Sequence, residues 1–588
     1  MMKKLLATLA LCALTLASAA ADKLLFSSTI DFLDYAFAHG DPKAGYYKLE
    51  DYEAAIRQMA EGGIKKLYLR VNICGTTHYP SEISAQYGDN DTFHWGDHTE
   101  AMYVINTYKH YNPCLETIRL GHKYGMEVWG WESLYDDAGV QYGRRGVEGY
   151  EKSYEWLDGW ALLDPWYVDN MDAFAMRDPL LVRKNQEDAA RYAPGNRLPV
   201  GRIVFTNDPM WKERKPPRIR SSKDLFIYVS DDNKDYRPYT GSYEVTPSVT
   251  EDGLNRFEVT GLSVREKYVK LAVRDMPQDG DYTMVMTRDR GQCQVYDTEG
   301  KELKSVWGIV HNGEEQFEQQ VYSSLNFAFY EPNTPSASSA LDYGNRAVGF
   351  SVGEPDMCDR DLYYYGVAEF TVPKAMEHKV ARFVELARYP FDGFMFNTRC
   401  HSGSGSNGVE FGYNPEVLEK FKARYGHEYA GTQEDIAGVF QIRGESIAEF
   451  FRRCKAESGG RPIYLSAPMP LELKDDPFYN GTFGPMPWLY KQYFADGSID
   501  GVMMIGKNFR NGRDFSEYFT PEITGGKDIK IGLFREMGAM PRGYQLLPDA
   551  KNAIAHGLAE IELYESVVIT DGLGASMVYP AIKAALEE

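Results

Sequence analysis

Short apolar runs that alternate with helix-length amphipathic segments constrain the fold of this 588-residue chain more than any other feature of its sequence. One such run, Phe394 to Phe396, follows a segment from Val372 to Arg388 whose apolar residues have helical spacing. A run that is apolar on both faces is typical of a parallel strand covered on both sides. Helices and strands in alternation therefore predict parallel βα units.

Eight such strands can be counted along the chain. They are predicted at Leu24–Ile30, Ile64–Val71, Met126–Trp131, Asp392–Asn397, Arg461–Ser466, Gly501–Ile505, Ile529–Phe534 and Ser566–Thr570. The helices predicted between them include Leu49–Glu61, Asn112–Tyr124, Val372–Arg388, Glu434–Glu457, Trp488–Phe494 and Asp549–Leu563. Eight βα units predict an α/β fold, the (β/α)8 TIM barrel, whose chemistry lies at the carboxyl ends of its strands.

Two of the strands open on an Asp-Gly pair, Asp392-Gly393 and Asp500-Gly501. Such a pair is typical of a turn that leads from a helix into a strand. Because this turn lies at the amino end of the strand, we expect both aspartates to serve the turn and not the chemistry.

The barrel pattern stops after the third strand. From Val200 to Val306, short alternating runs separated by turn residues predict an antiparallel β-sandwich inserted into the barrel. A further strand is predicted at Ala347–Val352. The predicted organisation is a signal peptide at 1–21, the first part of the barrel at 22–199, the inserted sandwich at 200–306 and the second part of the barrel at 307–588.

The first 21 residues carry two lysines, an apolar run from Leu5 to Ala17 and small residues before Asp22, a pattern typical of a secretory signal peptide. We therefore expect an exported protein, periplasmic or extracellular, and no later run is long enough to predict a transmembrane segment. Loss of the two signal lysines changes the formal charge from -21 to -23. That charge argues against a nucleic-acid partner. The scattered cysteines and histidines have no recognised ligand spacing, so neither a metal nor another cofactor is expected.

Two neighbouring stretches, FDGFMFNTRCHS from Phe391 and EFGYNPEVLEKFKARYG from Glu410, are similar to a known group. They resemble the family-10-like glycosyl hydrolases, exported bacterial barrel proteins formerly of unknown function. The resemblance implies a TIM barrel that hydrolyses O-glycosyl bonds in a carbohydrate substrate. This chain departs from the group at Asn397, which occupies the position of the frequent strand-end acid.

Within the insert, LFIYVSDDNKDYRPY from Leu225 resembles the discoidin-like carbohydrate-binding modules. That resemblance implies that the insert binds carbohydrate polymer. A sandwich with a purely structural role remains the alternative.

Cleavage of a glycoside needs two carboxyl groups, one that protonates the leaving oxygen and one that attacks or activates water. The seventh predicted strand ends Phe534-Arg535-Glu536, so Glu536 is the candidate nucleophile or base. A structural Arg535–Glu536 pair is the alternative. Because the fourth strand offers no carboxylate at its tip, the acid is sought elsewhere, among Glu132, Glu354, Asp571 and Glu410.

Substrate-binding candidates are polar or aromatic residues at or beyond the strand ends. They are Asn72, Trp95, Asn397, Arg399, His401 and Glu410. The spacing of two from Asn397 to His401 points these side chains the same way on an extended chain. A guanidinium can bind a carboxylate or sulfate, and an imidazole can bind a hydroxyl or carry a proton; alternatively, Arg399 neutralises a neighbouring acid. A second hypothesis is a carbohydrate-binding barrel that has lost catalysis, which the missing strand-four acid favours.

Overall fold

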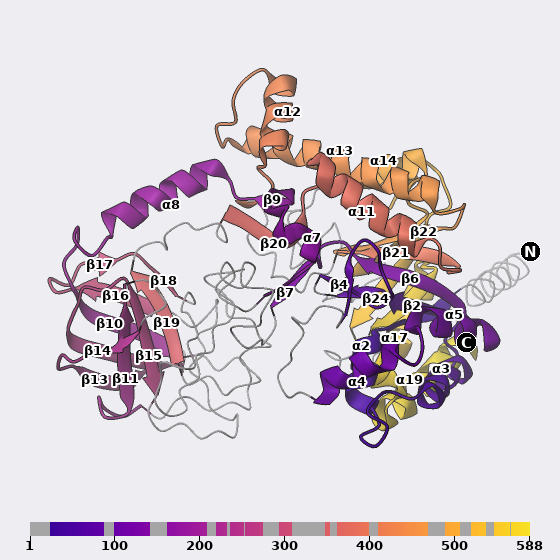
Figure 1. Ribbon diagram of the computed structural model, residues 1–588, viewed down its shortest axis with the longest axis horizontal. Coiled ribbons are helices and arrows are strands. Elements are labelled where there is room, and N and C mark those ends of the chain that lie inside the picture. Colours follow the sequence, from indigo (N-terminus) through magenta and orange to yellow (C-terminus); the bar gives the residue numbers. More distant parts are fainter. Residues whose placement is uncertain are drawn as a thin grey trace, which may run out of the picture.

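The computed structural model describes residues 24–73, 75–87, 99–140, 161–207, 219–231, 236–251, 253–273, 293–307, 347–352, 362–398, 410–468, 489–505, 519–536, 546–564 and 566–587. Eight parallel strands close into a barrel in the order β1-β2-β6-β21-β22-β23-β24-β25 (Figure 1). Their bounds are β1 Leu25–Ile30, β2 Lys66–Arg70, β6 Glu127–Ser133, β21 Gly393–Asn397, β22 Ile463–Pro468, β23 Gly501–Ile505, β24 Lys530–Glu536 and β25 Glu560–Tyr564. The predicted (β/α)8 barrel is confirmed.

Helices follow or precede these strands and cover the outside of the barrel. They include α2 Phe32–His39, α3 Leu49–Glu61, α4 Thr99–Tyr108, α5 Pro113–Lys123, α11 Pro373–Leu386, α13 Gln433–Glu457, α14 Tyr490–Asp496, α17 Leu546–Ala555, α18 Ser566–Thr570 and α19 Gly572–Glu587. A further helix, α12 Pro415–Tyr425, packs against α13. Their starts follow ordinary helix chemistry: Asn112 accepts hydrogen bonds from the first turn of α5, and proline stands at the first turn of α11 and α12. Among the described residues, no helix is both long and apolar enough to cross a membrane.

The prediction for the eighth strand is wrong. Ser566–Thr570 is the short helix α18, and the eighth strand is β25, which overlaps the end of the range predicted as the helix Asp549–Leu563. The β-branched residues of SVVIT favour a strand by intrinsic propensity. The two glutamates of EIELY interrupt the apolar pattern by which a barrel strand is recognised. Glu560 and Glu562 are buried, so β25 does not show the continuous apolar run expected of a barrel strand.

Both Asp-Gly pairs lie where a strand begins, but the glycines are strand residues and not turn residues. A Cβ atom on Gly393 would lie 2.6 Å from the ring of Trp129, and one on Gly501 would lie 2.5 Å from the ring of Tyr464. Each glycine therefore makes room for an aromatic side chain of the preceding strand inside the barrel.

The two aspartates bind the preceding strand in the same way. Asp392 accepts a hydrogen bond from the backbone N–H of Val128 at 2.7 Å, and Asp500 accepts one from that of Ile463 at 2.8 Å. Each carboxylate also meets a side chain from the helix before that strand, His122 in α5 or Lys455 in α13. Their role is structural, at the amino end of the barrel strands.

Between the two parts of the barrel lie two antiparallel five-stranded sheets. The first contains β13 Glu244–Val249, β14 Asn255–Val264, β10 Val200–Asn207, β16 Cys293–Asp297 and β17 Glu302–Leu303. The second contains β12 Arg237–Pro238, β11 Leu225–Ser230, β15 Tyr268–Val273, β19 Ala347–Val352 and β18 Ser305–Trp307. Apolar side chains of both sheets form one cluster. We call β10 to β19 the two-sheet unit; Figure 1 shows it apart from the barrel, after the helix α8 (Pro179–Arg191).

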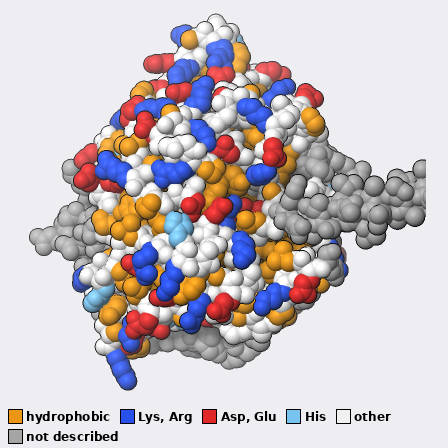
Figure 2. Space-filling model, turned by 90° about the vertical axis from the view of Figure 1, so that its right-hand side faces the viewer, with side chains coloured by type: hydrophobic (Ala, Val, Ile, Leu, Met, Phe, Trp, Pro, Cys, Tyr) orange, Lys and Arg blue, Asp and Glu red, His pale blue; other side chains and the backbone are white. Residues whose placement is uncertain are grey.

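Smaller elements lie near the carboxyl ends of the barrel strands. They are the three-stranded sheet of β3 Asn72–Ile73, β4 Thr76–Thr77 and β5 Ala85–Gln86, and the two-stranded pairs β7 Ala138–Val140 with β8 Ala161–Leu163 and β20 Tyr363–Ala368 with β9 Phe174–Met176. On the barrel side of the molecule, acidic and basic side chains are interspersed, so the surplus negative charge does not gather on that face (Figure 2).

Candidate active site

Alternation along each strand divides the barrel residues into an inner and an outer set. The inner set forms one cluster, which we call the lumen: Tyr68, Trp129, Trp131, Met395, Tyr464, Met503, Phe534 and Tyr564. The neighbouring residues, such as Leu67, Val128 and Leu533, belong to the cluster between the barrel and its helices. The side on which a residue lies therefore decides whether it can face a ligand in the barrel.

Aromatic rings line the upper lumen, near the carboxyl ends of the strands. The centroid of the Tyr564 ring lies 5.6 Å from that of Trp131 and 5.2 Å from that of Phe534. Beyond Trp131 on the same side of β6 is Ser133, in register with Asn397 of β21. Flat rings with hydroxyl and amide groups beside them are a common lining for sites that bind polar organic ligands.

Asn397 and Asn72, both predicted to bind substrate, are fully buried and engaged within the protein. The Nδ2 of Asn397 donates to the hydroxyl of Ser466 in β22 at 3.0 Å. Asn72 brackets the backbone of Ser133, donating to its carbonyl at 2.9 Å and accepting from its N–H at 2.7 Å. Asn72 thus fixes the end of β6 and presents neither of its side-chain atoms freely to a ligand.

An arginine holds two carboxylates together at the ends of the first barrel strands. Arg70, the last residue of β2, donates to Asp31 at 2.6 Å and to Asp136, and its Nε donates to the carbonyl of Asn72. Its guanidinium lies 5.6 Å from the Trp131 ring, so the triad borders the upper lumen. All three charged side chains are at most 4% exposed.

His78 lies close to this triad in the chain that follows β4. Its Nδ1 lies 2.8 Å from the hydroxyl of Tyr108, and its Nε2 has no hydrogen-bond partner among the described residues. Burial lowers the pKa of His78 to about 4. The imidazole is therefore neutral at pH 7.

The lower lumen contains a second set of buried charges. Lys66 donates to Glu560 at 2.7 Å and lies 4.2 Å from the centroid of the Trp129 ring. Glu562 lies two residues further along β25 on the same side, in register with Phe534. It accepts a short hydrogen bond from Thr29. Burial raises the pKa of the Glu562 carboxyl to about 8, so this acid is protonated at neutral pH.

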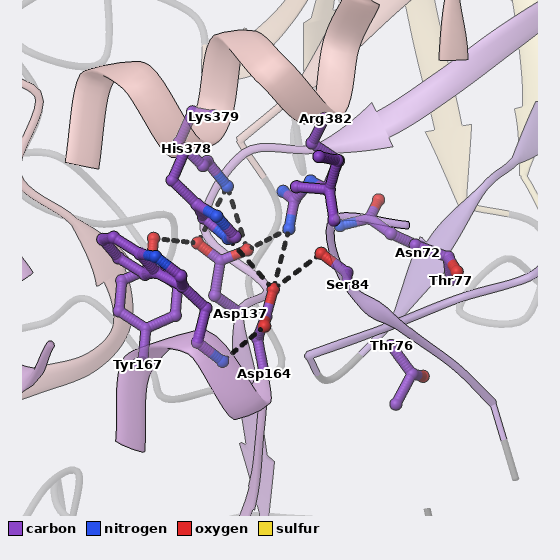
Figure 3. Close-up of polar contacts among 12 residues, drawn as sticks. Asn72, Thr76, Thr77, Ser84, Asp137, Asp164, Tyr167, His378, Lys379 and Arg382 are labelled. Carbon is purple, nitrogen blue, oxygen red and sulfur yellow. Dashed lines mark hydrogen bonds and ion pairs between the residues drawn. The ribbon is translucent and has the colours of Figure 1, made fainter. Parts of the chain in front are cut away.

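Glu132, a candidate acid, lies outside the lumen. Because its neighbour Trp131 points inward, Glu132 points outward, where Arg382 of α11 donates to it at 2.8 Å. Arg382 also donates to Asp137 at 2.6 Å, and Lys379 donates to both oxygens of Asp137 (Figure 3). Burial opposes the charge on Asp137, but the two cations hold the pKa of that carboxyl below its usual range.

The same buried network continues to the short helix α7 (Pro165–Val168). Asp164 accepts from Ser84 at 2.8 Å and lies 3.2 Å from the Nε2 of His378, while Tyr167 donates to Asp137 at 2.9 Å (Figure 3). These side chains are at most about a tenth exposed, and each has a polar partner within the network. The network attaches α11 to the barrel wall and leaves Glu132 no access to a substrate in the lumen.

The remaining predicted residues fall in different places. Asp571 is exposed between α18 and α19, where it pairs with His39 at 3.3 Å, and is not at a strand end. Glu410 is half-buried, and its carbonyl accepts from the N–H of Asp178. Glu536 is the last residue of β24, in register with Tyr564. Trp95, Glu354, Arg399 and His401 lie outside the described residues.

Sequence reasoning did not select Asp31, Arg70, Trp131 or Ser133. Asp31 directly follows the first strand, and Arg70 and Trp131 alternate with outward residues, so a strand-by-strand count of inner positions could have found them. Among the described residues, no group of three or more His, Cys, Asp and Glu is placed to hold a metal ion.

A closed parallel barrel with an aromatic and polar upper lumen is thus the class of structure defined here. No known family profile and no curated protein matches the sequence. Similar solved structures include a β-amylase catalytic domain from Paenibacillus polymyxa (9% identity, 96% of this chain and 99% of that chain, TM-score 0.36) and a β-galactosidase from Marinomonas ef1 (9% identity, 96% and 59%, TM-score 0.37). Another is bee venom hyaluronidase in complex with a hyaluronic acid tetramer (10% identity, 37% and 77%, TM-score 0.22).

Proposed function

We propose that this protein is an exported glycoside hydrolase that cleaves a polysaccharide or oligosaccharide by carboxylate acid/base catalysis at the carboxyl end of the barrel. The observation that carries the proposal is the upper lumen. The rings of Trp131 and Tyr564 lie there with hydroxyl and amide groups, beside the carboxyl end of β24 where Glu536 stands. Flat apolar faces and neutral polar groups, at the end of a strand whose last residue is a glutamate, fit a sugar ring and its cleavage.

In this proposal Glu536 is the nucleophile or the base. Glu132 is excluded as the acid by its pairing with Arg382 on the outer side of β6, and Asp571 by its exposed position after α18. Glu354, and Glu410, which follows Arg399 and His401 in the sequence, stay as candidates for the acid. Export by the signal peptide and polymer binding by the two-sheet unit belong to the same proposal.

Glu536→Gln tests the assignment because it removes the charge and keeps the shape of the side chain. We expect turnover of the best substrate to fall by roughly 10²- to 10⁴-fold, with folding and sugar binding preserved. The substrate is identified by incubating the mature protein with neutral, uronic and sulfated polysaccharides and measuring new reducing ends.

The matched control is Glu127→Gln at the opposite end of the barrel, where Glu127 accepts a hydrogen bond from the Nε1 of Trp129 at 2.9 Å. This variant should keep native turnover. Near-native turnover of Glu536→Gln would remove Glu536 from the chemistry.

A carbohydrate-binding barrel without catalysis is the second candidate function. It is favoured by Asn397, which stands at the end of the fourth barrel strand and is tied to Ser466 where a catalytic acid would be expected. Saturable binding of a sugar without the release of any reducing end would establish this function in place of hydrolysis.

A further inference from the structure

Two polar side-chain atoms on the lumen side of β6 are fully buried and have no hydrogen-bond partner among the described residues. They are the Nε1 of Trp131 and the hydroxyl oxygen of Ser133, both in residues with 0% exposure. Buried polar groups in folded proteins are nearly always hydrogen-bonded, so these two atoms are open to a partner from outside the described residues. Because these residues alternate on β6 with the outward Glu132, both atoms belong to the lumen side.

The surrounding contacts fix both groups in place. Asn72 holds the backbone of Ser133 by two hydrogen bonds, and the Trp131 ring packs edge-on against Tyr564. Both residues have 0% exposure, so neither group reaches the solvent. Groups held in this way are preorganised for a ligand.

The charges of the lumen define the kind of ligand. The strands place two buried cations there, Arg70 and Lys66, and both are committed: Arg70 to Asp31 and Asp136, Lys66 to Glu560. The Arg70 triad therefore has one more acidic group than basic groups. An indole N–H and a hydroxyl carry no charge, so no described group of the upper lumen offsets the charge of a carboxylate or a sulfate.

We propose that Trp131 and Ser133 hydrogen-bond a hydroxyl of an uncharged sugar unit, and that the site selects neutral glycans over uronic or sulfated ones. Trp131 donates to the hydroxyl oxygen, and Ser133 either donates to it or accepts from it. The inference rests on the proposed function and adds the class of substrate and two specificity-determining residues.

The test uses the mature full-length chain and matched sets of neutral, uronic and sulfated oligosaccharides. We expect kcat/KM on the best neutral substrate to exceed that on its charged counterparts by tenfold or more. Ser133→Ala should lower kcat/KM on the neutral substrate by roughly tenfold, the loss expected for one hydrogen bond to a ligand. Its melting temperature should not fall, because the hydroxyl has no hydrogen-bond partner among the described residues. Trp131→Phe should show a similar loss of kcat/KM.

Ser28→Ala is the matched control, because Ser28 is an equally buried barrel serine whose hydroxyl donates to the carbonyl of Leu563 at 2.8 Å. This variant should lower the melting temperature and leave kcat/KM unchanged. Preference for a charged glycan, or native kcat/KM in both Ser133→Ala and Trp131→Phe, would overturn the inference and leave the glycoside hydrolase standing. Absence of both cleavage and binding for every sugar would overturn the proposed function and the inference together.

Discussion

Neighbouring residues on one barrel strand have opposite roles because successive side chains point to opposite sides. Trp131 and Ser133 lie on the lumen side of β6, whereas Glu132 between them is bound by Arg382 on the outer side. A carboxylate at the right end of the right strand is thus insufficient for catalysis. Its position in the alternation decides whether it meets the substrate or a helix.

The buried carboxyl of Glu562 makes the stability of the fold depend on pH. The folded protein holds the proton of this carboxyl up to about pH 8, whereas the unfolded chain loses it near the ordinary value of 4.5. Folding therefore takes up a proton between these values, and stability from this group falls as the pH rises toward 8. We expect Glu562→Gln to flatten the decrease in melting temperature above pH 6.5.

The window above pH 6.5 avoids an opposing contribution from His78. The folded-state pKa of His78 is about 4 against an ordinary 6.5, so its contribution to stability grows as the pH rises between those values. Melting curves of both proteins at pH 6.5 to 8 make the comparison. Parallel pH dependences would show that Glu562 is ionised in the folded state.

At the scale of elements, α11 is attached to the barrel by a buried ion network and not by apolar packing alone. Arg382 forms ion pairs with both Glu132 and Asp137 and so compensates their negative charges. Arg382→Met would leave both carboxylates buried with reduced compensation, so we expect a loss of about 3–5 kcal/mol in the free energy of unfolding. Denaturant unfolding measures the change.

Arg453→Met is the comparison variant for this measurement. Arg453 of α13 forms a bidentate pair with Glu377 of α11 near the surface, at 2.7 Å for both contacts. Its loss should change the free energy by only about 0–1 kcal/mol. Equal effects of the two substitutions would contradict a special role for the buried network.

Elements with continuous apolar runs were predictable from the sequence, and their bounds agree with the structure to within two residues, as for β23 and β24. The strand β25 was not predictable, because its Glu560 and Glu562 are stabilised in the lumen by Lys66 and Thr29, which lie far away in the sequence. The candidate site likewise has a part that the sequence predicted and a part that it did not. The order of the strands along the chain was enough to predict the end of β24. The triad around Arg70 brings together residues that follow different strands. A local sequence pattern does not predict such contacts.

At the scale of the whole molecule, the barrel and the two-sheet unit have separate hydrophobic clusters. The barrel cluster extends from Leu24 to Ala585, while the cluster of the two-sheet unit runs from Val200 to Val352 and shares no residue with it. The second sheet includes β19, which pairs with β15 and β18. A deletion that stops at residue 306 would leave β19 without these partners.

Deleting residues 200–352 and joining the ends by a short Gly-Ser linker should therefore leave a barrel that unfolds cooperatively, because its own cluster is kept intact. If the two-sheet unit binds polymer, kcat/KM on a polysaccharide should fall, while kcat/KM on a short oligosaccharide of the same linkage stays near the native value, since only attachment at a second site is lost. Calorimetry and reducing-end measurements on both substrates test the two parts separately. An equal loss on both substrates from a folded barrel would instead make the two-sheet unit part of the substrate cleft, and a chain without a cooperative transition would show that the barrel depends on it.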